Sequence, residues 1–216
     1  MKLEEFLDFI RSKLEEKEVA REELLKLVRE MRINSTKAIA SIHAGDFEKA
    51  ESYLKNAIEI LKKVVEYKIY PDIYYPVTFD AMQELVEAYV FMHIVKESNL
   101  DIDLTKLDVE FAPILTGLAD AVGEIRRHVL DLLRKNEFER AEKLIGIMER
   151  IYNNLITFSF PDRITPNLRP KVDYVRNAIE RTKSDFISAK TSALSEELRR
   201  FEETVKKLST NLNNFE

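Results

Sequence analysis

Glycine and proline, the residues that most often interrupt regular structure, are scarce in this chain, with only 4 Gly and 6 Pro among 216 residues. Charged residues make up 34% of the sequence and hydrophobic residues 45%. Apolar residues recur at helical spacing rather than in the alternation of a strand, as in Leu3, Phe6, Leu7, Ile10 and Leu14. The sequence therefore predicts an all-α fold, a single domain over residues 1–216 built as a bundle of about six or seven helices.

Turn and capping signals divide the chain into these helices. Gly45 is expected to cap one long helix, or two in tandem, and Asp46 to begin the next helix. The two prolines between Tyr70 and Pro76 predict a turn. The later helices are expected at about 46–67, 77–97, 113–134, 136–157 and 167 to beyond 208, the last with a candidate break near Ser184 or Ser192 and a frayed tail over 211–216.

One internal repeat is visible. Residues 45–51 (Gly-Asp-Phe-Glu-Lys-Ala-Glu) resemble residues 136–142 (Asn-Glu-Phe-Glu-Arg-Ala-Glu). In each copy, a residue that tolerates the left-handed backbone conformation ends one helix, and an acid begins the next. Two copies are too few for a solenoid of stacked repeats, so they predict two helical hairpins within one bundle.

Composition excludes several classes of protein. With no Cys, the chain has neither a disulfide framework nor a thiolate zinc site. No apolar run reaches the length of a membrane span, and Met1-Lys2-Leu3-Glu4-Glu5 leads into a charged helix rather than a signal peptide, so the expected location is the cytoplasm. The net charge of −5 means that nucleic-acid binding would need a local basic patch.

Carboxylates occur in an otherwise apolar helix around Gln83 to His93. Asp80, Glu84 and Glu87 share one face of this helix, and no Lys or Arg occurs from Val77 to Val95. A carboxylate in apolar surroundings is costly unless it is paired, protonated or bound to a cation. The pattern therefore indicates a bound cation, or a positive charge that another part of the chain supplies.

A second acidic pair, Asp120 and Glu124, lies on one face of the helix that follows Pro113, among small residues that would let another helix approach closely. Two helices that each carry a carboxylate pair can hold a hard divalent cation such as Mg²⁺ or Mn²⁺ through oxygen ligands. Such a cation can activate water and neutralise charge on a phosphate, which is the chemistry of phosphodiester hydrolysis.

Two other interpretations remain open on spacing alone. The acids could belong to a structural ion-pair network, with Arg127 paired to Glu124 and distant bases paired to Glu84 and Glu87. Spacing slightly favours this network over a metal site. A di-iron carboxylate bundle would require Glu-x-x-His on two helices, whereas the spacing here is Glu-x-x-Glu and His93 follows Glu87 by six residues.

The two acidic segments resemble the translin family, in its translin-associated factor X (TRAX) branch. Residues 83–88 (Gln-Glu-Leu-Val-Glu-Ala), with Phe91 and His93, are similar to the signature helix of that branch, and residues 118–124 (Leu-Ala-Asp-Ala-Val-Gly-Glu) are similar to its second acidic segment. The resemblance continues in Ser35-Thr36-Lys37, in Ile42-His43 and from Leu168-Arg169 to Phe186, over about residues 20–186. The segment past Ser188 has no clear counterpart.

The resemblance implies an all-helical subunit of a closed, hollow octamer, and a Mg²⁺-dependent endoribonuclease that acts on single-stranded or processed RNA inside the shell. Mn²⁺ is the alternative cofactor. The other branch of the family, translin proper, binds RNA and single-stranded DNA and lacks most of the acids. By position, Glu84, Glu87 and Asp120 match the metal-binding catalytic carboxylates, and Glu124 matches an additional acid. Asp80 has no counterpart, so we interpret it as an acid near a helix N-terminus, stabilised by the helix dipole.

The resemblance also suggests where nucleic acid would bind. Lys37 and His43 lie near family positions that contact nucleic acid, and Arg32, Arg126 and Arg127 are further candidates for a basic chamber wall. Where translin carries a basic cluster, this chain reads Tyr-Tyr-Pro-Val-Thr over residues 74–78, so these tyrosines either stack on bases or pack a turn. The alternatives to a nuclease are a non-catalytic binder of RNA or single-stranded DNA and a purely structural oligomer.

Overall fold

The computed structural model describes residues 2–213, with side chains as far as residue 207. Within this range it contains six α-helices, two short 3₁₀ helices and no strand, which confirms the all-α prediction. None of the described helices combines the length and apolarity that crossing a membrane requires. The elements are α1 (Leu3–His43), α2 (Phe47–Val65), η1 (Glu66–Ile69), α3 (Pro71–Glu97), η2 (Leu104–Lys106), α4 (Phe111–Arg134), α5 (Phe138–Leu155) and α6 (Leu168–Asn213).

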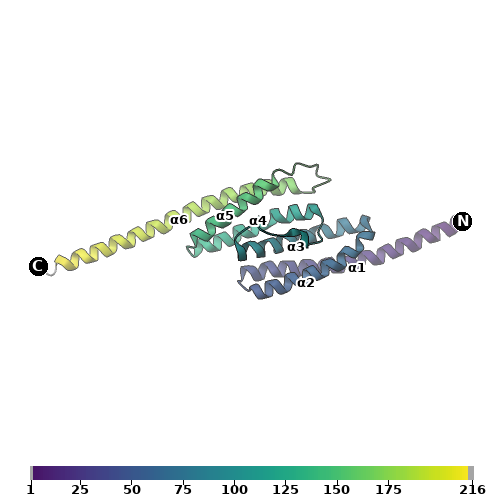
Figure 1. Ribbon diagram of the computed structural model, residues 1–216, viewed down its shortest axis with the longest axis horizontal. Coiled ribbons are helices and arrows are strands. Elements are labelled where there is room, and N and C mark those ends of the chain that lie inside the picture. The colour runs from purple at the N-terminus through teal and green to yellow at the C-terminus, as the bar shows by residue number, and fades with distance from the viewer. Residues whose placement is uncertain (1, 214–216) are drawn as a thin grey trace.

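Helices α3 and α4 form the centre of the bundle. The α1–α2 hairpin packs on one side of this central pair, and α5 and α6 pack on the other (Figure 1). The apolar residues of α3 lie on all of its faces, as a helix covered on several sides requires. Its buried side chains include Met82, Leu85, Phe91 and Ile94. Glu84 and Glu87 therefore lie, partly buried, on a central helix of the bundle rather than on an outer one.

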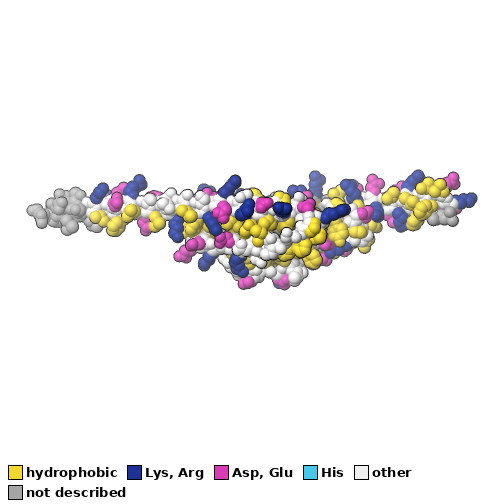
Figure 2. Space-filling model, turned by 90° about the horizontal axis from the view of Figure 1, so that it is seen from above, with side chains coloured by type: hydrophobic (Ala, Val, Ile, Leu, Met, Phe, Trp, Pro, Cys, Tyr) yellow, Lys and Arg dark blue, Asp and Glu magenta, His cyan; other side chains and the backbone are white. Residues whose placement is uncertain are grey.

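The two longest helices extend beyond the bundle. The N-terminal end of α1 and the C-terminal end of α6 project in opposite directions (Figure 1). Figure 2 shows hydrophobic side chains on both projecting ends. The exposed apolar residues there are Leu3, Phe6, Leu7, Phe9, Ile10 and Leu14 on α1, and Leu194, Leu198, Phe201 and Val205 on α6.

The two repeated corners have the predicted conformation. Gly45 has φ +76° and Asn136 has φ +60°, so each helix before the corner ends in the left-handed region. Asp46 then caps α2 by accepting a hydrogen bond from the backbone N–H of Lys49 at 3.2 Å. The prediction of two helical hairpins, α1–α2 and α4–α5, agrees with these corners.

Several element boundaries differ from those expected from the sequence. The predicted turn at Tyr70–Pro76 is wrong: α3 begins at Pro71, where the missing N–H costs nothing, and includes Pro76 at the expense of one backbone hydrogen bond. Asp80 consequently lies in the third turn, too far from the helix N-terminus for the proposed dipole stabilisation. Helix α6 runs without a break past Ser184 and Ser192. It includes residues 211–213 of the expected tail, and residues 214–216 lie outside the described residues.

Gly117 is the position where α3 and α4 come too close together for a side chain. A Cβ atom there would lie 2.6 Å from the carbonyl oxygen of Gln83 and 2.7 Å from the Cβ of Val86. We expect Gly117→Ala to lower the free energy of unfolding by about 2–3 kcal/mol, because the two helices must separate. Gly146→Ala is the matched control: a Cβ there meets nothing within 4 Å, so the variant should gain up to about 1 kcal/mol of helix propensity. Urea denaturation checks both, and equal effects at the two positions would contradict this account.

Candidate functional site

Four carboxylates lie close enough along the contact between α3 and α4 to influence one another electrostatically. Glu84 and Glu87 are three residues apart on α3, and Asp120 and Glu124 are four residues apart on α4, so each pair occupies one side of its helix. All four are partly buried. We call Glu84, Glu87, Asp120 and Glu124 the acidic cluster.

Glu87 is the most perturbed member of the acidic cluster. Burial, and then the negative charges of Asp120, Glu124 and Glu84, raise its pKa to about 8. Within the described part of the chain, no base forms an ion pair with its carboxylate. Glu87 is therefore largely protonated at neutral pH unless a cation is brought close to it.

The other three acids have partners from outside α3 and α4. The Arg32 Nε of α1 donates to Glu84 at 2.7 Å, and the Thr36 hydroxyl also donates to Glu84. From α6, the Lys171 ammonium donates to both carboxylate oxygens of Asp120, at 2.6 and 2.8 Å. Burial nevertheless raises the pKa of Asp120, with the charge of Lys171 opposing it. The structure thus combines an ion-pair network at Glu84 and Asp120 with an unpaired acid at Glu87.

His43 holds the fourth acid. Its Nε2 lies 2.5 Å from a Glu124 carboxylate oxygen, and its ring lies 4.8 Å from the ring of Phe91, measured between centroids. This hydrogen bond lowers the pKa of Glu124, against the effect of burial. The His43 side chain is only 7% exposed, so it offers little surface to nucleic acid. The position that the resemblance associates with RNA contact is therefore occupied by a residue that orients Glu124.

The other basic candidates divide into two groups. The Arg127 side chain is 64% exposed, and its Nη1 lies 4.0 Å from Glu124 Oε2, at the edge of the acidic cluster. Lys37 lies over the ring of Tyr53, at 5.6 Å from its centroid, and contacts none of the four acids. Arg126 joins α4 to α6 by donating to Thr182 and Asp185 at 2.8 and 2.9 Å. Of these three residues, only Arg127 reaches the acidic cluster.

The tyrosines at the start of α3 lie apart from these contacts. Tyr74 is fully buried and packs edge-to-face against Tyr75, with ring centroids 5.3 Å apart. Lys68 lies over the ring of Tyr74. The buried ring of Tyr74 packs inside the protein and is not free to stack on a base. Tyr74 belongs to helix α3, however, and not to the predicted turn.

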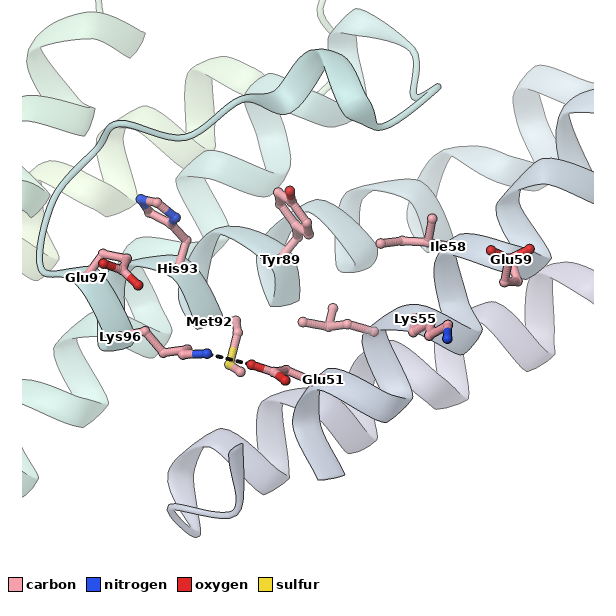
Figure 3. Close-up of a pocket in the computed structure, with 10 residues that line it drawn as sticks. Glu51, Lys55, Ile58, Glu59, Tyr89, Met92, His93, Lys96 and Glu97 are labelled. Carbon is pink, nitrogen blue, oxygen red and sulfur yellow. Dashed lines mark hydrogen bonds and ion pairs between the residues drawn. The ribbon is translucent and has the colours of Figure 1, made fainter. Parts of the chain in front are cut away.

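A pocket of about 380 Å³ lies between α2 and α3, and its lining includes none of the four acids. Tyr89, Met92 and His93 of α3 line it, and the Lys96–Glu51 ion pair joins the two helices at its edge (Figure 3). His93 forms a hydrogen bond with Asn99 at 2.9 Å. His93 is therefore not part of the acidic cluster, which counts against the di-iron interpretation.

Sequence reasoning missed two of the residues that contact the acids, Lys171 and Thr36. Lys171 is 51 residues from Asp120 in the sequence, and the pairing depends on how α6 packs on α4. Thr36 lies in a segment that contributed to the resemblance, but its spacing does not indicate Glu84 as its partner. In neither case does the local sequence carry a signal that identifies the contact.

Comparison with known proteins decides the family. The sequence model of the translin family matches residues 19–211, which make up most of the chain. The match thus continues past residue 186, where the motif resemblance ends. The chain belongs to the translin family.

This translin-family chain is also similar to solved structures. It is 52% identical to AfC3PO in the structure of an AfC3PO–duplex RNA complex, with a TM-score of 0.82, covering 87% of this chain and 98% of that one. It is 28% identical to apo-NeC3PO, with a TM-score of 0.76, covering 85% of this chain and 96% of the other. An uncharacterised protein of Methanocaldococcus jannaschii is 29% identical over 184 residues, which span 84% of this chain and 82% of that protein.

Proposed function

We propose that this translin-family protein is a Mg²⁺-dependent endoribonuclease of the TRAX-like type. The observation that carries the proposal is Glu87, an unpaired and partly buried acid on which the charges of three other acids act. The likeness to AfC3PO, a protein solved in complex with duplex RNA, supports RNA as the ligand. We extend the proposal to a homo-oligomer, an octamer by resemblance, that acts in the cytoplasm.

The donor set of the acidic cluster fits a hard cation in its chemistry. As the side chains stand, no three Asp, Glu or His residues in the described range converge to hold a metal ion. Arg32 and Lys171 occupy two of the acids instead. We propose that Glu84 and Asp120 turn from these bases and, together with the unpaired Glu87, hold Mg²⁺, with Mn²⁺ as an alternative. When it is bound, Mg²⁺ supplies positive charge to the phosphate and acidity to a coordinated water.

The remaining residues have separate tasks. Glu124, held by His43, accepts the proton of the attacking water or hydroxyl. Arg32 and Lys171 lie beside the acids and bind the phosphates that flank the scissile bond. Arg127 at the edge of the acidic cluster adds a further phosphate contact. The net charge of −5 is compatible with RNA binding because phosphates respond to the local field.

The test is cleavage of a single-stranded oligoribonucleotide with Mg²⁺ and with a chelator. We expect the Glu84→Ala/Glu87→Ala double variant to lose at least about a hundredfold in rate. Asp80→Asn is the control, because Asp80 is exposed on the same helix and outside the acidic cluster. Undiminished cleavage by the double variant would rule out this mechanism.

A non-catalytic binder of RNA or single-stranded DNA is the second candidate. The observation that favours it is the engagement of Glu84 and Asp120 by bases, which can be read as a completed ion-pair network. This function predicts salt-dependent binding without metal-dependent cleavage.

A further inference from the structure

Tyr174 places an exposed aromatic ring beside the acidic cluster. It lies on α6, three residues after Lys171, and is 57% exposed. Its hydroxyl is 3.8 Å from the point where a Cβ on Gly123 would lie, and Gly123 is between Asp120 and Glu124 on α4. Among the described residues, none forms a hydrogen bond or a ring contact with Tyr174. The packing of the bundle therefore leaves this ring largely uncovered.

The surface next to the ring is open on the side of α4. A Cβ on Gly123 would make only an ordinary contact with Tyr174, and the backbone there is not in the left-handed region. Neither packing nor conformation requires glycine at this position, in contrast to Gly117. The absence of a side chain leaves the helix surface bare between two of the acids and next to the ring.

Positive charges lie along the same side of α6. Lys171 precedes Tyr174 by one turn and binds Asp120, and Arg181 follows it by two turns. Arg181 is exposed and forms no ion pair with another residue of the described range. A cation, an aromatic ring and a second cation in this order are the elements with which proteins follow a single nucleic-acid strand.

We propose that Tyr174 stacks on an unpaired base of the RNA next to the scissile phosphate, while Lys171 and Arg181 contact the backbone on either side. This inference rests on the proposed function, because it assumes that the acidic cluster is where the RNA is cut. A base within a duplex is stacked between its neighbours, so its face is not free for the ring. Tyr174 therefore selects RNA with an unpaired nucleotide at the cleavage position over RNA that is fully paired.

Binding measured in a chelator tests the proposal without depending on cleavage. The probes are a single-stranded oligoribonucleotide and a duplex of the same length, with fluorescence anisotropy as the readout. We expect Tyr174→Ala to weaken single-strand binding about ten- to a hundredfold, to change duplex binding less than about twofold, and to be rescued by Tyr174→Phe. Ile187→Ala, which removes another exposed side chain of α6, is the control and should bind as the parent does.

A second probe reports stacking directly. In a single strand that carries 2-aminopurine, the parent and Tyr174→Phe should quench the fluorescence of the base, and Tyr174→Ala should not. Equal loss of single-strand and duplex binding, or no loss, would overturn the proposal. So would an altered oligomeric state in Tyr174→Ala with unchanged RNA binding, because the ring would then pack against another protein chain. If the parent stacks RNA in chelator but fails to cleave it with Mg²⁺, the nuclease function fails and the stacking role stands.

Discussion

The Glu87→Gln variant should be more stable than the parent at neutral pH, although it should lose RNA cleavage. In the folded protein the pKa of Glu87 is raised to about 8, whereas its ordinary value is 4.5. Between these values the folded chain keeps a proton that the unfolded chain has released, so the stability of the parent falls as pH rises. Glutamine does not titrate, and its stability advantage should grow by roughly 2–3 kcal/mol between about pH 5 and about pH 7.

Thermal unfolding over a pH series checks this result. The unfolding temperatures of parent and variant should be nearly equal at about pH 4 and below, where the carboxyl is protonated in both the folded and the unfolded chain. Glu97→Gln removes the same charge from an exposed position of α3 and should show no such divergence. Mg²⁺ should raise the unfolding temperature of the parent more than that of Glu87→Gln. If the unfolding temperatures of parent and variant differed by the same amount at every pH, Glu87 would not be buried among acids.

Removing His43 should also have a large effect. We expect His43→Ala to lower the free energy of unfolding by about 2–4 kcal/mol, because Glu124 would remain partly buried without its partner. Part of this loss comes from the contact between the rings of His43 and Phe91. A double-mutant cycle with Glu124→Gln separates the two contributions and should give a coupling of about 1–3 kcal/mol at neutral pH.

The pH dependence of this coupling has a definite sign. The pKa of Glu124 is lowered from 4.5 by the hydrogen bond with His43. The stabilisation is therefore present above the ordinary value and is lost as pH falls through the folded-state pKa. His93→Ala is the matched control, because that ring forms a hydrogen bond with Asn99 and no ion pair. A coupling that persists at about pH 2 would contradict a carboxylate–histidine pair.

The helical period was sufficient to place the acids but not their partners. Residues three or four positions apart lie on the same side of a helix. The spacing therefore puts Glu84 and Glu87 on one face of α3, and Asp120 and Glu124 on one face of α4. Arg32 is 52 residues from Glu84, and their pairing follows from how α1 packs on α3. Local patterns carry no information about such packing.

The errors in the predicted helix boundaries come from local sequence signals. Two prolines in six residues favour a turn, yet Pro71 stands where a helix tolerates proline, and tertiary packing of the buried Tyr74 outweighs the hydrogen bond lost at Pro76. The misplaced start of α3 then led to the wrong interpretation of Asp80. The error in this helix boundary thus changed the interpretation of Asp80, which lies nine residues after Pro71.

Gly117 and the acidic cluster lie on the same contact between α3 and α4, and Gly117 is one turn before Asp120. At this contact the backbones approach closely, and the negative charges of Asp120, Glu124 and Glu84 oppose ionisation of the unpaired Glu87. Whatever neutralises those charges should therefore slow the transient separation of the two helices, seen as slower amide hydrogen exchange along both of them. Ligand binding would then be reported by the central helices themselves, without a mobile loop that closes over the site.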